Sequence, residues 1–174
     1  MNARLHQIFK QLEAQRQQVL SEVKAATPEK LLQAPAGKWT VLQILAHLLQ
    51  AERLSLQYMR KKALGIEQTS DAGWWEDVKM LALKISQRVP GLKFRAPKVV
   101  VDTTPSYATL ADLERDWSAL RSELHDFIGT IPDSYTNRKI YRHAFAGRLS
   151  APQALVFFGE HITHHHPQVK ALLR

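Results

Sequence analysis

Four histidines gather near the end of the chain, in the segment HITHHHPQVK at residues 161–170. Imidazole nitrogens bind transition metals, so the spacing decides which of these side chains can share one ion. On an α-helix each residue turns by about 100°, which places His161 and His165 about 40° apart on one face. His164 lies at the edge of that face. His166 lies about 140° from His161 and is expected to face water.

The apolar stripe of this helix centres between His161 and His165, so the pair is expected to point toward the core. The stripe consists of Ala154, Phe157, Phe158, Val169 and Leu172. Two imidazoles one turn apart on one helix face can reach the same cation, as they do in metalloprotease helices. The spacing alone fits a pair of ordinary core histidines equally well. A purification tag is a poor explanation, because Ile and Thr interrupt the histidines and an amphipathic pattern continues beyond them.

A third ligand must come from another element, and His47 in the segment WTVLQILAHLLQAE is the candidate. The residues that share its helical face are Thr40, Ile44, Ala51, Leu54 and Tyr58. The segment is apolar nearly all round, so His47 is expected to be buried, where an unpaired polar group is costly. A metal shared with His161 and His165 would satisfy His47. A hydrogen bond to a neighbouring core residue would satisfy it too.

Hydrophobic periodicity predicts four long helices to position these residues, and a shorter one at 74–88. The long helices are expected over residues 4–24, 40–64, 109–128 and 151 to at least 166. Ser150 and Gln153 have the spacing of a capping box at the start of the last one. The connection at 25–36 has room for one helical turn. A short strand at 99–101 would have nothing obvious to pair with, so no strand is predicted.

The fold class predicted is all-α, because each amphipathic stripe needs a partner to cover it. We expect one four-helix bundle domain over residues 1–174, with a long crossover between the second and third main helices. Pro167 lies inside the last helix and removes a backbone donor to Thr163. It is therefore expected to kink or end that helix after His165, which makes the placement of Gln168 and Val169 doubtful.

Composition narrows the classes of protein. The chain has 174 residues, no cysteine and a net charge of +8, so disulfides and thiolate sites are excluded. We expect no membrane span and no secretory signal, and a cytoplasmic location is the simplest expectation. Six cations and no acid lie between Lys79 and Lys98. A basic stretch can attract nucleic acid or another anion. Because no nucleic-acid motif accompanies this one, nucleic acid is ranked last among the partners.

Three stretches, taken in their order and spacing, resemble the DinB/YfiT-like family of metal-binding four-helix bundles. They are GKWTVLQILAHLLQAE (37–52), HAFAGRLSAPQALVFFGEH (143–161) and HITHHHPQV (161–169). The family pattern has a tryptophan several residues before a histidine of the second helix. It ends in a histidine, a second histidine four residues later and a glutamine three beyond that. In this sequence the matching positions are Trp39, His47, His161, His165 and Gln168.

The resemblance implies a divalent metal held by His47, His161 and His165, with Zn, Ni and Fe among the ions found in such sites. It also implies hydrolase, isomerase or thiol S-transferase chemistry on a small-molecule substrate, and a homodimer. Imidazole ligands suit Zn, Ni, Cu or Fe better than Mg or Ca. Three neutral ligands would leave open positions, where a metal could lower the pKa of a water or a thiol. Since the chain has no cysteine, that thiol would be a small co-substrate.

No general base is evident, because Glu160 and Glu52 both point away from the ligand faces. Gln43 and Gln168 lie nearer those faces and could orient imidazoles or water. His143 could line the pocket or serve a loop. Two functions therefore stay open, a metal-dependent transferase or hydrolase and a non-catalytic metal- or small-molecule-binding bundle protein. The missing base favours the second.

Overall fold

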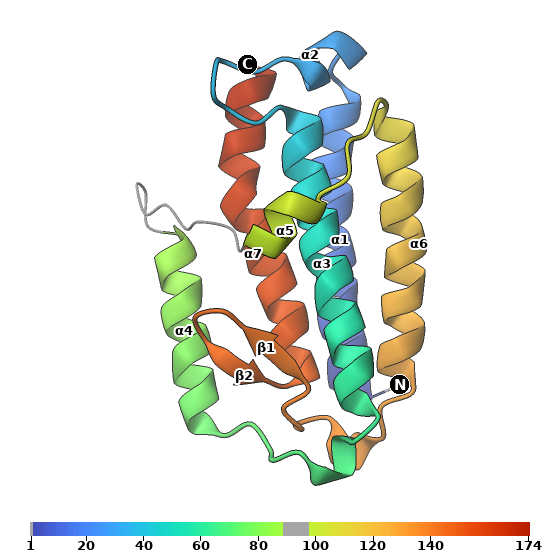
Figure 1. The fold of residues 1–174 in the computed structure, drawn as a ribbon, viewed down its shortest axis with the longest axis vertical. Coiled ribbons are helices and arrows are strands. Elements are labelled where there is room, and N and C mark those ends of the chain that lie inside the picture. Colours follow the sequence, from blue (N-terminus) through green and yellow to red (C-terminus); the bar gives the residue numbers. More distant parts are fainter. Residues whose placement is uncertain (1, 89–97) are drawn as a thin grey trace.

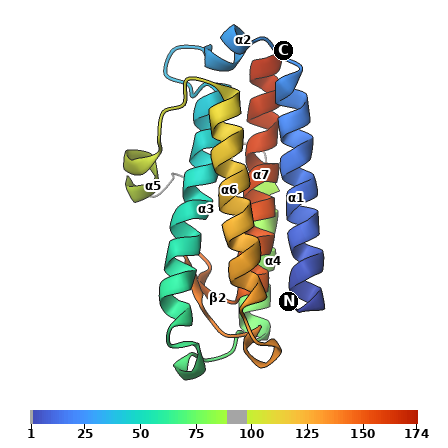
Figure 2. The same cartoon turned by 90° about the vertical axis from the view of Figure 1, so that its right-hand side faces the viewer.

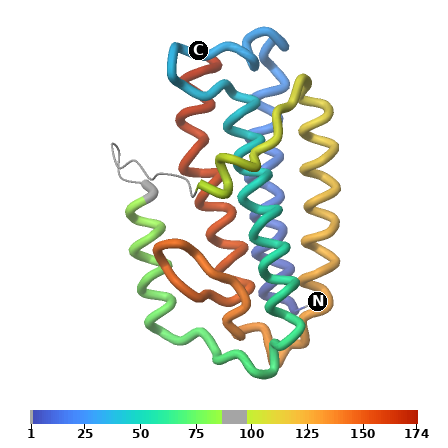
Figure 3. Tube along the Cα trace, in the orientation of Figure 1, coloured from blue at the N-terminus to red at the C-terminus, as the bar shows by residue number. Residues whose placement is uncertain are grey.

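The chain folds around four long helices, α1 (Ala3–Lys24), α3 (Val41–Ala63), α6 (Leu110–Gly129) and α7 (Ala151–Leu173). A computed structural model describes residues 2–88 and 98–174. The long helices lie side by side, with α1 and α7 running in one direction and α3 and α6 in the opposite one (Figures 1 and 3). This confirms the predicted four-helix bundle.

Shorter elements connect and cover the long helices. The elements are α2 (Pro28–Leu32), η1 (Ile66–Gln68), α4 (Trp74–Arg88), α5 (Lys98–Thr103), η2 (Asp133–Tyr135), β1 (Tyr141–His143) and β2 (Gly147–Leu149). Helix α4 packs on α7, and α5 packs beside α3 outside the bundle (Figure 2). Among the described residues, no helix combines the length and the hydropathy that a membrane crossing needs.

The helix starts follow the sequence signals. Thr40 Oγ1 accepts a hydrogen bond from the Gln43 backbone N–H, and Gln43 Oε1 accepts one from the Thr40 N–H. Gln153 Oε1 likewise accepts from the Ser150 N–H, as the capping-box spacing predicts. Each start satisfies backbone donors that a helix end leaves unpaired. The two helices that carry the histidines are therefore fixed at their first turns.

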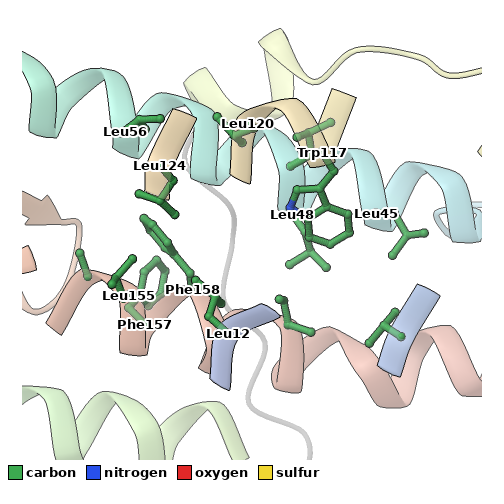
Figure 4. Close-up of a cluster of buried hydrophobic side chains, with 14 of the residues drawn as sticks. Leu12, Leu45, Leu48, Leu56, Trp117, Leu120, Leu124, Leu155, Phe157 and Phe158 are labelled. Atoms are coloured by element: carbon green, nitrogen blue, oxygen red, sulfur yellow. The ribbon is translucent and has the colours of Figure 1, made fainter. Parts of the chain in front are cut away.

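The core lies between the long helices and is built from large apolar side chains. Figure 4 shows Leu12 of α1, three leucines of α3, Trp117 of α6 and Phe158 of α7 meeting there. Trp117 is fully buried. Each amphipathic stripe covers the stripe of a neighbour, which is the main stabilisation of such a bundle.

Two sequence expectations differ from the structure, and one open question is answered. Residues 99–101, for which a strand was considered but not predicted, lie within the helix α5. A two-stranded antiparallel hairpin, β1–β2, pairs Tyr141 with Leu149 and was not expected. Helix α7 does not end at Pro167 but continues to Leu173. Val169 is fully buried beyond the proline, and this packing offsets the missing backbone hydrogen bond.

A buried charge network joins α3 to α6 and α1. Glu52 Oε1 accepts from Arg121 Nη2 at 2.7 Å, and Glu52 Oε2 accepts from Trp117 Nε1 at 3.0 Å. Arg121 also lies 3.4 Å from Glu13, which binds Arg16. Burial raises the pKa of the Glu52 carboxyl, whereas Arg121 and Trp117 oppose that rise. Both oxygens of this buried carboxylate are therefore satisfied from α6.

Removing the Glu52 charge should destabilise the bundle strongly, because it leaves Arg121 buried without its main partner. We expect Glu52→Gln to lower the free energy of unfolding by about 3–5 kcal/mol, measured by urea denaturation. The matched control is Glu123→Gln, which breaks the exposed pair with Arg60 and should cost less than about 1 kcal/mol. Equal, small losses in both variants would show that the network contributes little.

Candidate metal centre

Helices α3 and α7 bring three imidazoles to one point. His47 Nε2 lies 3.3 Å from His161 Nε2, and His165 Nε2 lies 3.1 Å from the same atom. One ligand nitrogen from each of the three residues lies within 4.8 Å of the others. The structure therefore brings together the three histidines that the sequence singles out, one from α3 and two that are one turn apart on α7.

The dimensions of this cluster suit a single transition metal. Two nitrogens that each lie about 2.0–2.1 Å from a tetrahedral zinc ion are about 3.3–3.4 Å apart. Two of the three nitrogen separations are 3.3 and 3.1 Å. The donor set of three imidazoles also suits Zn, Ni or Fe. The residues present thus fit the metal that the resemblance implies.

All three imidazoles are neutral in the fold. Burial lowers the pKa of His47 and of His165 from 6.5 to about 4. Burial, followed by the neighbouring histidines, lowers the pKa of His161 well below 6.5. Because metal ligation needs an unprotonated nitrogen, these shifts leave all three side chains ready to bind near neutral pH.

The side chains beside the ligands have different roles. Gln168 Oε1 lies 3.0 Å from His165 Nδ1, so it accepts the Nδ1 proton and leaves Nε2 with a free lone pair. The centroid of the Trp39 ring lies 5.0 Å from the centroid of the His47 ring. His47 Nδ1 is buried and has no hydrogen-bond partner among the described residues. Gln43 is exposed, and its amide oxygen accepts from the Thr40 N–H at the start of α3. It is absent from the described residues that line the cavity beside the cluster.

His143 belongs to the unexpected hairpin. Its Nδ1 accepts hydrogen bonds from the backbone N–H groups of Phe145 and Ala146, at 3.2 and 3.1 Å. The centroid of the His143 ring lies 4.3 Å from that of the Phe157 ring. Burial lowers the pKa of His143 to about 4. A neutral imidazole that accepts at Nδ1 carries its proton at Nε2. His143 therefore serves the loop through one nitrogen and lines the cavity beside the cluster.

A cavity of about 700 Å³ opens at the three histidines. Its walls come from α3, α4, α5, the hairpin and α7, and from Trp39 before α3. The described residues that line it include no aspartate or glutamate. Ligand pockets typically have volumes of about 300–1,000 Å³ and mostly apolar walls, so the cluster lies at the wall of a cavity that can hold a small molecule.

The other histidines of the segment diverge, as the helical geometry predicts. His164 lines the cavity beside His165. His166 lies on the far side and its Nε2 is 2.8 Å from Glu22 of α1, so it contacts that helix as well as water. Glu160 pairs with Lys84 of α4, and it is absent from the cavity lining.

Sequence reasoning missed much of the cavity wall. Tyr141, Arg142 and Phe145 reach it from the hairpin, and Ser55 and Phe157 reach it from the long helices. The three-residue strands are too short for a periodic signal. The spacing of Ser55, two turns after His47, was a signal available for α3. Of the basic stretch between Lys79 and Lys98, the cations Lys93 and Arg95 lie outside the described residues.

The comparisons with known proteins agree with the fold. A sequence model of the DinB superfamily matches residues 11–169. A solved structure of YfiT from Bacillus subtilis aligns with a TM-score of 0.58 at 16% identity, covering 99% of this chain and 87% of that one. YfiT is described as a probable metal-dependent hydrolase with an unusual four-helix bundle topology. No curated protein matches the sequence.

We expect protein purified without a tag to bind about one equivalent of zinc or nickel per chain, through the three imidazoles. Changing His161→Ala should abolish this binding, because His161 Nε2 lies closest to both other ligand nitrogens. His166→Ala is the matched control, since His166 lies on the same helix and contacts Glu22 instead. Elemental analysis after dialysis measures both variants, and circular dichroism verifies that they fold. Full metal content in His161→Ala would contradict the site.

Proposed function

The chain belongs to the DinB superfamily, and from this membership we propose that it is a metal-dependent enzyme acting on a small molecule in the cavity. The observation that carries the proposal is the meeting of three neutral imidazoles at the wall of that cavity. Buried groups with shifted pKa values in a cleft are typical of functional sites. The hydrolase description of YfiT gives the reaction class further support.

His47, His161 and His165 would hold a divalent transition metal, of which Zn, Ni and Fe are the candidates. When bound, such an ion supplies Lewis acidity and lowers the pKa of a water or thiol at its open position. Gln168 keeps the His165 Nε2 lone pair free by accepting from Nδ1. Phe157 stacks on His161 with an interplanar angle of 13°, which limits rotation of that ring.

We assign His143 as the hydrogen-bond donor of the site. Its Nδ1 is held by two backbone N–H groups, so the proton stays on Nε2. Because burial lowers its pKa to about 4, the ring stays neutral and donates without changing charge. A preorganised donor aimed at an oxygen that gains negative charge typically contributes a factor of about 10²–10³ to kcat. This would fit hydrolysis of a carbonyl compound.

The nucleophile is water in hydrolysis or a low-molecular-weight thiol in S-transfer. The second possibility needs a co-substrate, since the chain contains no cysteine. A non-catalytic metal- or small-molecule-binding protein is the alternative. It is favoured by one observation, the absence of a carboxylate base among the described residues that line the cavity.

The proposed role of His143 as a hydrogen-bond donor can be separated from its structural role in the loop. Asn offers an oxygen near the position of Nδ1, so His143→Asn should keep the two backbone hydrogen bonds and lose only the Nε2 donor. We expect kcat for activated esters or thiol transfer to fall about 10²–10³-fold, with metal content and melting temperature preserved. Metal-loaded protein without chelator-sensitive turnover on either substrate class would favour the binding protein instead.

We also propose that two copies pair through the outer face of α4. Its inner face packs on α7 through Met80 and Leu83, yet apolar side chains also cover the opposite face. This outer stripe is Trp74, Trp75, Val78, Leu81 and Ile85, exposed by 43–75%. Two copies of the stripe would bury on the order of 1,200 Å², the lower end for a stable interface.

The acidic and basic side chains of α4 are engaged within the chain and leave the outer stripe apolar. Glu76 pairs with Lys139, Asp77 accepts from Gln153, and Lys84 pairs with Glu160. An apolar stripe is complementary to a copy of itself, so a two-fold axis can pair two α4 helices.

Sedimentation velocity tests this pairing. We expect a dimer that Leu81→Asp converts to a monomer, because the change places a charge at the centre of the stripe. Leu64→Asp is the control, since Leu64 is 91% exposed and lies outside α4. A monomeric wild-type protein would refute the pairing. Binding of that monomer to anionic vesicles, lost in Leu81→Asp, would assign the stripe to a membrane surface.

A further inference from the structure

The cavity is elongated along the bundle, with the histidine cluster at one end. On α3 it is lined at helical spacing from His47 through Ala51 and Ser55 to Tyr58. Eleven residues of helix separate His47 from Tyr58, a rise of about 16 Å. On α7 the lining runs from His165 back to Phe157, about 12 Å along the axis. The space therefore extends well beyond what a water or a small thiol at the cluster would fill.

The long part of the cavity is apolar. Leu54, Leu83, Val100 and Phe157 line it from α3, α4, α5 and α7. Among the described residues that line it, Arg142 is the one side chain that is charged at neutral pH. A cationic ligand would find no counter-charge there, whereas a neutral or anionic one meets no repulsion. Apolar walls this long stabilise a ligand whose body is itself apolar.

We propose that the cavity takes an elongated acyl group, with its carbonyl or carboxylate end at the histidine cluster and its hydrocarbon chain along α3 toward Tyr58. This rests on the proposed function for the reacting end, and it names the substrate class as esters, thioesters or amides of medium-chain acids. An extended chain advances about 1.2 Å per bond. Over the roughly 12 Å that α3 and α7 both line, the cavity thus accommodates an acyl chain of about eight to ten carbons.

The hydrolytic step balances simply for such a substrate. Water adds its oxygen to the acyl carbon, and the bond from that carbon to the leaving oxygen, sulfur or nitrogen breaks. One proton of the water goes to the leaving group, and the second goes to solvent as the carboxylic acid ionises. No oxidant or reductant takes part. The product is a medium-chain carboxylate, which gives a probe for binding that needs no turnover.

Straight-chain carboxylates from acetate to dodecanoate test the proposal by isothermal titration, with metal-free and with zinc-loaded full-length protein. We expect affinity to rise about two- to fourfold per added CH₂ up to eight to ten carbons and then to level off. Ala51→Phe should move this limit to four carbons or fewer, because the ring would lie across the cavity one turn from His47. Val100→Trp narrows the cavity from the side of α5, and it replaces Ala51→Phe as the test variant if Ala51→Phe fails to fold.

Ala14→Phe is the matched control, since Ala14 is exposed on α1, away from the cavity; it should leave the series unchanged. An affinity that is independent of chain length overturns the proposal. So does a chain-length dependence that survives both cavity variants, because the chain would then bind elsewhere. If acetyl esters are cleaved as well as octanoyl esters, the proposed enzyme stands and the acyl channel is refuted. If binding depends on chain length but no ester is turned over, the acyl channel stands and the proposed enzyme is refuted.

Discussion

Three imidazoles can meet at one point only while α3 and α7 stay antiparallel and in close contact, and this contact determines the rest of the site. The nitrogens of His47 and His161 come within 3.3 Å of each other from different helices. Burial removes the charge from these rings, so they do not repel one another as imidazolium ions would. The same burial supplies the apolar cavity. The geometry of the three histidines, their neutrality and their apolar surroundings thus have one cause.

Helix α3 is held in place from its other side. Glu52 follows His47 by five residues and so points away from the cluster, where Arg121 and Trp117 of α6 bind it. This network keeps the charges of Glu52 and Arg121 on the side of α3 that faces α6, away from the cavity. The cavity side of α3 carries His47, Ala51 and Ser55 and no ionised group. The position of α3 can therefore be fixed by strong charged contacts without adding charge to the cavity.

The long helices and the histidine triad were predictable because both depend on a repeat of 3.6 residues. The spacing of His161 and His165, and the burial of His47, follow from which residues share a helix face. The hairpin was not predictable in this way, since β1 and β2 have three residues each. The prediction that Pro167 would end the last helix was wrong, because packing of the buried Val169 overrides the low helix propensity of proline. Glu52 was correctly placed off the site, but its partner on α6 needed the tertiary fold.

The long helices and the connecting elements contribute different parts of the site, and this difference determines how substrate specificity can arise. The long helices supply the three histidines of the candidate metal centre, and their packing fixes where these side chains meet. The cavity walls opposite α3 come from α4, α5 and the hairpin, which belong to the connections between the long helices. Connections tolerate change better than packed helices do. A superfamily with this architecture can keep three histidines and alter the shape of its cavity, so shared ligands alone would not identify a shared substrate. The length and apolar character of the cavity are thus the features of this chain from which we infer its substrate class.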